Sequence, residues 1–176
     1  MIMTVTGDQL TLEPLGSIGE ARAEWTTLAA ASGNPFATVE WCEAWLEHAA
    51  AGARPRLFAA LRDGKPVAIV PLVIIHGRYV RKARFLGYGA ANELGPVGLE
   101  RGADALRLAL DATRGEWDVF HGETLPGGGW PERLGATLVG REGSPVVSGP
   151  WPSWDDYLAT RSHNFRGELR RKERRL

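Results

Sequence analysis

Four polar residues stand at places in the chain where side chains often bind or react. Asn92 and Glu93 lie in the glycine-rich stretch GYGAANELGPVG, and His121 and Glu123 follow the apolar segment WDVF. Loops and strand ends frequently carry binding residues, and a carboxylate or an imidazole can take a proton from an attacking nucleophile. Glu93 and His121 are therefore candidate catalytic residues, and Asn92, Glu93 and Glu123 candidate substrate-binding residues. A surface turn with a strand-end hydrogen bond is the structural alternative.

Metal and thiol chemistry have less support in the sequence. The four histidines are scattered, and the H-x-E of His121 and Glu123 cannot be completed by the P-C-x-x-C of a zinc deaminase, because Cys42 is the only cysteine. Cys42 lies beside Trp41 in an apolar segment, which predicts a buried, inert thiol. We therefore expect no metal site and no cysteine nucleophile.

Two glycine runs also fall short of nucleotide-binding motifs. The triple glycine at 127–129 precedes Trp-Pro rather than Lys and Ser or Thr, so a loop followed by a short helix is expected there. The GYG at 87–89 has Asn92 where a dinucleotide fingerprint needs its third glycine. No cofactor-binding residue is identified.

Composition indicates an ordinary globular protein. The 176 residues are 44% hydrophobic and 24% charged, with 21 basic and 21 acidic side chains, so no global field draws the chain to nucleic acid or membrane. The first residues lack the pattern of a secretion signal, and the apolar run at 67–75 is far shorter than the about 20 residues of a spanning helix. A soluble, cytoplasmic protein without a membrane partner is expected.

The N-terminal half predicts a strand, two helices and a three-strand meander. The strand covers 9–15, and Ser17 with Glu20 has the spacing of a capping box for a helix that ends before Gly33. Thr38 is expected to cap the next helix, whose Trp41 and Trp45 are expected to pack in the core. The meander strands lie at 56–62, 66–75 and near 79–86, with a tight Asp-Gly turn at 63–64. A bulge or an unpaired edge is expected at the proline within the second of them, Pro71.

The second half predicts shorter elements around that sheet. They are a short strand at 96–99, a helix at 103–113 closed by Gly115, a buried strand at 116–122, a strand or hairpin at 136–149, and a short helix from 153 capped by Ser153 and Asp156. The fold class is α+β: a mixed, mainly antiparallel sheet covered by helices on both faces, followed by a C-terminal basic helix.

The chain ends in a basic segment. Residues 161–176 carry seven positive and two negative side chains, and Phe165, Leu169 and Leu176 lie near one helical face. A helix with one narrow apolar seam is expected. Nucleic-acid binding is a weaker alternative, because aromatic residues beyond Phe165 do not interleave with the basic ones.

Several stretches occur together in the order of one known family: NPFATVEWCEAWLEH, RKARFLGYG, NELGPV, WDVF and WPSWDDYLATRSHNFRGELRRKERRL. Over nearly its whole length the chain resembles the N-terminal half of the CelD-like, cellulose-biosynthesis-protein-like acyltransferases, bacterial members of the GNAT superfamily with a Fem-type tandem architecture. The resemblance implies a GNAT-like domain at 1–160, a basic connecting helix at 161–176 and a second GNAT-like domain or polypeptide as partner. It also implies acyl-CoA as co-substrate and a small-molecule acceptor carrying an amine or a hydroxyl.

One family motif has no counterpart here. The acyl-CoA loop of the type Q/R-x-x-G-x-G/A, whose amides hold the pyrophosphate, is not found, and RLGATLVG at 133–140 has its glycines at other spacings. We therefore expect a truncated or split acyltransferase that is inactive alone. A non-catalytic scaffold is the alternative, and weak nucleic-acid binding by the basic tail is the third.

Overall fold

A computed structural model describes residues 10–50, 52–98, 102–126, 129–143 and 149–174. The chain divides into two compact units, Met1–Gly140 (the main unit) and Arg141–Leu176 (the C-terminal unit), and each is described by itself. The expected boundary at residue 160 stays a prediction. Within the described residues, every helix is too short or too polar to cross a bilayer.

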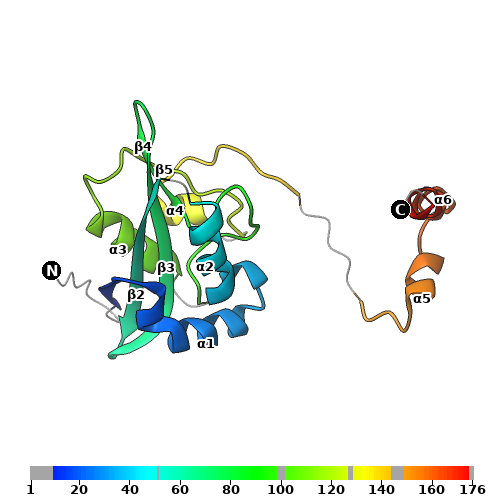
Figure 1. The fold of residues 1–176 in the computed structure, drawn as a ribbon, viewed down its shortest axis with the longest axis horizontal. Coiled ribbons are helices and arrows are strands. Elements are labelled where there is room, and N and C mark those ends of the chain that lie inside the picture. The colour runs from blue at the N-terminus through cyan, green and yellow to red at the C-terminus, as the bar shows by residue number, and fades with distance from the viewer. Residues whose placement is uncertain (1–9, 51, 99–101, 127–128, 144–148, 175–176) are drawn as a thin grey trace. The chain divides into compact units, whose positions relative to one another are not determined.

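The main unit is built on one mostly antiparallel sheet (Figure 1). Its five strands are adjacent in chain order, and only the pairing of β4 with β5 is parallel. The strands are β1 (Leu10–Leu15), β2 (Ala53–Arg62), β3 (Lys65–His76), β4 (Arg81–Phe85) and β5 (Val119–Phe120). The α+β class and the mainly antiparallel sheet are thus confirmed.

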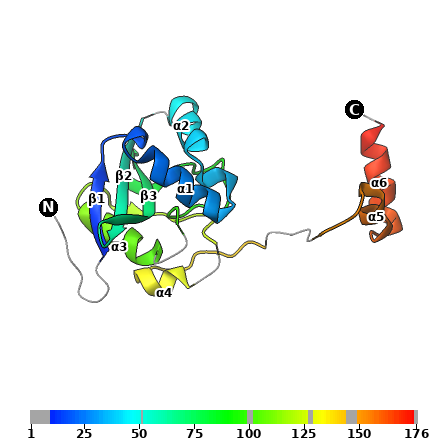
Figure 2. The same cartoon turned by 90° about the horizontal axis from the view of Figure 1, so that it is seen from below.

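Helices cover both faces of this sheet (Figure 2). On one face, α1 (Arg22–Ser32) and α2 (Val39–His48) pack a core around Trp25 and Trp45. On the other, α3 (Gly102–Ala112) packs Leu106 against Phe58 and Phe85, and Trp130 of α4 (Trp130–Leu134) adds to this core. Successive strand residues alternate between the two cores, as the period of a strand requires.

Local capping follows the sequence in most places. Gly33 ends α1 with a left-handed φ of 65°, and the Thr38 hydroxyl accepts a hydrogen bond from the Trp41 amide at the start of α2. The prediction of a capping box at Ser17 is wrong. The Ser17 side chain forms no capping hydrogen bond, and the Glu20 carboxylate instead accepts a hydrogen bond from the Gly16 amide. A 3-10 turn, Ile18–Ala21, therefore precedes α1, and a second one, Pro35–Ala37, precedes α2.

The β2–β3 hairpin turns at Asp63 and Gly64, whose φ angles are 51° and 74°, as predicted. The bulge, however, does not lie at Pro71. Pro71 pairs with Leu57, whereas the register shifts where Ala60 faces Ala68 and Leu61 faces Pro66, which leaves Val67 as the extra residue. Pro71 is thus a paired residue of the longest strand.

Pro71 has no amide hydrogen, and the pairing of β3 with β4, on the side away from β2, ends next to it. The last β3–β4 pair is Leu72 with Phe85, and the Pro71 carbonyl accepts a final hydrogen bond of 2.9 Å from the Leu86 amide. The amide and carbonyl of one strand residue point to the same side, so the missing donor faces the point where β4 ends. Pairing on that side resumes with the isolated bridge between Ile69 and Val97.

Three expectations for the second half need correction. The strand at 116–122 shrinks to the two residues of β5 at the sheet edge, where Val119 is 48% exposed. The strand at 96–99 is reduced to the single bridge at Val97. Residues 136–143 form no strand, because they are exposed and pair with no described strand, and 144–148 lie outside the described residues.

The C-terminal unit contains two capped helices, α5 (Trp154–Ala159) and α6 (His163–Glu173). The Ser153 hydroxyl caps α5 by accepting a hydrogen bond from the Asp156 amide, as predicted. Trp154 stacks on Tyr157 with ring centroids 5.1 Å apart, and the Arg161 guanidinium lies 4.5 Å from the centroid of the Tyr157 ring. The expected basic helix is therefore present and begins at His163.

Gly98 is expected to tolerate no side chain. A Cβ there would lie 2.4 Å from the Val67 carbonyl oxygen, at a φ of 121°. Gly98→Ala should lower the free energy of unfolding by about 2–4 kcal/mol, from backbone strain and overpacking together. Gly64 also has a left-handed φ, but a Cβ there would meet open space. Gly64→Ala should therefore lower the free energy of unfolding by only about 1–2 kcal/mol. Chemical denaturation measures both, and equal losses would contradict the close packing at Gly98.

Asp118 should make stability depend on acid pH. Its carboxylate accepts hydrogen bonds from the Arg81 side chain and backbone, which lower its pKa from 3.8 to about 2. A lowered folded-state pKa stabilises the fold above the unfolded value and loses that contribution as pH falls from about 4 to about 2. Asp118→Asn should therefore destabilise at neutral pH, with the difference shrinking toward pH 2 in denaturation measured across pH. A constant difference would contradict this.

Candidate functional site

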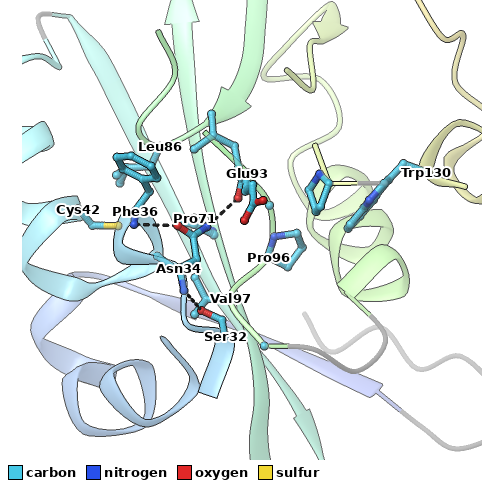
Figure 3. A pocket seen from close by; sticks show the side chains of 15 residues that line it. Ser32, Asn34, Phe36, Cys42, Pro71, Leu86, Glu93, Pro96, Val97 and Trp130 are labelled. Atoms are coloured by element: carbon cyan, nitrogen blue, oxygen red, sulfur yellow. Dashed lines mark hydrogen bonds between the residues drawn. The ribbon is translucent and has the colours of Figure 1, made fainter. Parts of the chain in front are cut away.

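A small cavity of about 190 Å³ lies where the edge of β3 is interrupted (Figure 3). Its buried lining includes Cys42, Pro71, Leu86 and Val97. Leu94 is also buried. The other lining residues are half-buried or exposed, namely Ser32, Asn34, Phe36, Ala37, Glu93, Gly95, Pro96, Gly98, Pro126 and Trp130. The cavity is thus mostly apolar and contains few polar side chains.

Asn34 connects the helical layer to the loop that follows β4. Its Oδ1 accepts a hydrogen bond from the Phe36 amide, and its Nδ2 donates one to the Glu93 carbonyl, each 2.9 Å long. The first bond is a local cap of the turn before α2, whereas the second spans 59 residues. One amide side chain therefore places Phe36 and Glu93 at the same cavity.

The opposite side of this loop is held by residues that follow β5. The Leu94 amide donates to the Thr124 carbonyl at 3.1 Å, and the Gly89 amide donates to the Glu123 carboxylate at 2.9 Å. Glu123 also forms a half-buried ion pair with Arg84, whose guanidinium lies 4.0 Å from the centroid of the Tyr88 ring. The loop is therefore fixed at both sides without being a strand or helix.

Glu93 has an unusual backbone conformation and an uncommitted side chain. Its φ is 53°, in the left-handed region, which costs a residue with a Cβ about 1–2 kcal/mol. Within the described residues, its exposed carboxylate has no hydrogen-bond or ion-pair partner. Strained conformations held by their surroundings often occur at functional sites. Asp63 and Thr124 have similar φ angles of 51° and 50°, but Glu93 is the one of these three residues that lines the cavity.

The candidates from the sequence separate in space. Glu93 lines the cavity, whereas Asn92, His121 and Glu123 are not among its lining residues. Glu123 is occupied by its ion pair with Arg84. His121 is exposed, and its amide donates to the Ala83 carbonyl, continuing the β4–β5 pairing. Glu123 thus has the structural role of a strand-end hydrogen bond and ion pair, whereas a role in binding or catalysis stays a prediction for Glu93.

Several lining residues were missed by sequence reasoning. Asn34 could be recognised only as a local cap next to Pro35, and Trp130 only as the residue before a helical proline. Their place beside Glu93 depends on contacts between distant segments, and the sequence contains no signal of these contacts.

Among the described residues that line the cavity, the ionisable side chains are Glu93 and Cys42. Burial raises the pKa of the Cys42 thiol to about 12. The described lining contains no Lys or Arg that could neutralise a phosphate. Nowhere in the described residues do three His, Cys, Asp or Glu side chains gather as metal ligands would. The arrangement can hold a small apolar group beside one carboxylate.

Comparison with protein-family models, with curated proteins and with solved structures finds no match to this chain. The family resemblance and the function it implies are therefore proposals.

Cys42 should be chemically silent in the folded protein. A buried thiol with a raised pKa presents almost no thiolate at neutral pH. We expect iodoacetamide at mildly alkaline pH to leave the native chain unmodified and to alkylate it fully in guanidinium chloride, as read by mass spectrometry. Rapid alkylation of the native chain would show instead that the Cys42 thiol is accessible to the reagent and ionised.

Proposed function

We propose that this chain is the acceptor-side half of a GNAT-superfamily acyltransferase, similar to the CelD-like enzymes. In this proposal the cavity beside Glu93 binds the acceptor, and a second GNAT-like domain or polypeptide holds the acyl-CoA. The observation that carries it is the Glu93 carboxylate, which has no partner among the described residues and belongs to a residue with a left-handed backbone at a largely apolar cavity. The α+β sheet with helices on both faces agrees with the resemblance.

The proposed reaction needs a proton acceptor next to the nucleophile. The acceptor's nitrogen or oxygen attacks the thioester carbonyl carbon, so that a C–N or C–O bond forms while the C–S bond breaks. The Glu93 carboxylate takes the proton of the nucleophile and passes it to the departing sulfur, so that coenzyme A leaves as its thiol and the carboxylate is restored. Proton removal by a positioned carboxylate typically contributes about 100-fold or more to the rate. Glu93 suits this role better than His121 because Glu93 lines the cavity and His121 does not.

The acyl donor fits this cavity poorly. Its volume of about 190 Å³ is small compared with the roughly 300–1,000 Å³ of typical ligand pockets. Among the described residues, the lining also includes no Lys or Arg that could neutralise the phosphates of coenzyme A. These two properties support a donor site supplied by another domain or polypeptide, and they predict an inactive lone lobe.

Activity should therefore require a second component. The purified chain would be assayed for coenzyme A release from acetyl-CoA with a panel of small amines and alcohols. The assay is run with the chain alone and with the polypeptide encoded immediately downstream, co-expressed. We expect turnover only in the pair and a fall of about 100-fold for Glu93→Gln. Exposed Glu13 on β1 supplies the control, and Glu13→Gln should leave turnover unchanged. Turnover by the lone chain, or none in the pair, would contradict the proposal.

A non-catalytic interaction domain is the second candidate, and the C-terminal unit favours it. Trp154 is 57% exposed and Phe165 is 43% exposed, and a groove of about 630 Å³ runs along α5 and α6. Exposed aromatic clusters often mark protein contacts. Co-purification with the downstream polypeptide, lost in Trp154→Ser, without any acyl transfer would favour this second candidate.

A further inference from the structure

We infer that the cavity beside Glu93 selects a small primary amine with an apolar body. Its part in acyl transfer rests on the proposed function, but the amine recognition itself follows from the lining. Four properties lead to this ligand class: among the described lining residues the neutral polar side chains are bonded within the protein and one charge has no partner, the walls are apolar, and the volume is small.

The neutral polar side chains of the lining are committed to the protein. Both ends of the Asn34 amide are bonded, to the Phe36 amide and to the Glu93 carbonyl. The Ser32 hydroxyl donates to the Ala29 carbonyl at 2.7 Å and accepts from the Asn34 amide at 3.2 Å. A ligand with several hydroxyls would leave them without partners here, and buried polar groups without partners are unfavourable. Sugars and polyols are therefore poor ligands for this cavity.

The remaining charge is negative. Glu93 has no partner among the described residues, and the thiol of Cys42 is protonated because it is buried. A carboxylate without a neighbouring cation attracts an ammonium group and repels a carboxylate or phosphate. The Glu93 carboxylate is also the group to which that ammonium can later yield its proton. Charge thus favours an amine over an alcohol and over an acid.

The walls and the volume define the rest of the ligand. Phe36, Leu86, Pro96 and Trp130 present apolar surface to the cavity (Figure 3). A volume of about 190 Å³ corresponds to about six water molecules at roughly 30 Å³ each. A single ring or a short alkyl chain fills such a space, whereas a peptide or a nucleotide does not. The predicted ligand is therefore an aralkyl or alkyl monoamine.

The fold does not require the side chain of Glu93. Glycine adopts a φ of 53° without strain, yet the chain has a glutamate at this place. The bonds that hold the position use the carbonyl of Glu93 and the amide of Leu94, not the carboxylate. Folding alone would thus be satisfied by glycine.

Binding to the purified 176-residue chain tests this inference without any acyl donor. Isothermal titration would compare benzylamine with benzyl alcohol, which lacks the charge, and with ethanolamine, which lacks the apolar body. Benzylamine should bind about fivefold more tightly than benzyl alcohol, the most that a largely exposed carboxylate is expected to add, and at least about tenfold more tightly than ethanolamine. Equal affinities in either comparison would overturn the proposed ligand class.

Two substitutions of Glu93 separate recognition from folding. Glu93→Gln should weaken benzylamine binding about fivefold and leave benzyl alcohol unchanged, while Glu13→Gln changes neither. Glu93→Gly should lose the same selectivity without lowering the thermal unfolding midpoint, because glycine relieves the left-handed strain. Asp63→Gly, at a φ of 51°, is the matched control for that stability effect. A lower midpoint for Glu93→Gly alone, or unchanged benzylamine affinity in Glu93→Gln, would overturn the inference.

The same measurements distinguish the two proposals. Selective benzylamine binding without acyl transfer in the two-component assay would retain the amine site and refute the acyltransferase. Acyl transfer to alcohols, with no preference for benzylamine, would retain the acyltransferase and refute the amine selectivity.

Discussion

A proline in the middle of the longest strand is the constraint on which the site depends. Pro71 is paired through its carbonyl but cannot donate a hydrogen bond to the strand beside it. β4 therefore ends next to it, and the chain leaves the sheet after Leu86 and returns only at Val97. Because the sheet edge is interrupted rather than continued, there is room for a cavity between the two helical layers and the loop.

An excursion of this length would be mobile unless other segments held it. Here the loop is attached to the N-terminal layer by Asn34 and to the segment after β5 by Glu123 and Thr124. Each attachment uses a loop backbone group. The side chains of Ala91 and Leu94 are buried in the core, whereas the Glu93 carboxylate is exposed and has no partner among the described residues.

The two compact units support the proposal in different ways. In the main unit, the described lining of the cavity contains the Glu93 carboxylate and no Lys or Arg. The C-terminal unit presents exposed aromatic rings and a basic helix, on which the proposal of a polypeptide partner rests. Folding also places Tyr157 near Phe165, with ring centroids 6.5 Å apart, so the aromatic residues on this helix are less isolated than the sequence suggests.

The sequence by itself determined the parts of the fold that depend on neighbours within a few residues. The turn at Asp63 and Gly64, the end of α1 at Gly33 and the cap at Thr38 were predictable because the groups involved lie within about one turn of each other. The alternation of apolar residues likewise identified the meander and the two covered faces. Glu93 and Glu123, by contrast, were both candidates for substrate binding, since both are acidic residues near glycines.

Only the tertiary structure decided between them. Arg84 on β4 forms an ion pair with Glu123, which follows β5, and the Asn34 side chain donates a hydrogen bond to the Glu93 carbonyl, 59 residues away in the sequence. The sequence likewise left open whether Pro71 causes a bulge or an unpaired edge, and the structure shows the unpaired edge, where β4 ends beside the missing amide. Hydrogen bonds and ion pairs between distant segments depend on how the whole chain packs, and no local pattern of residues encodes their partners.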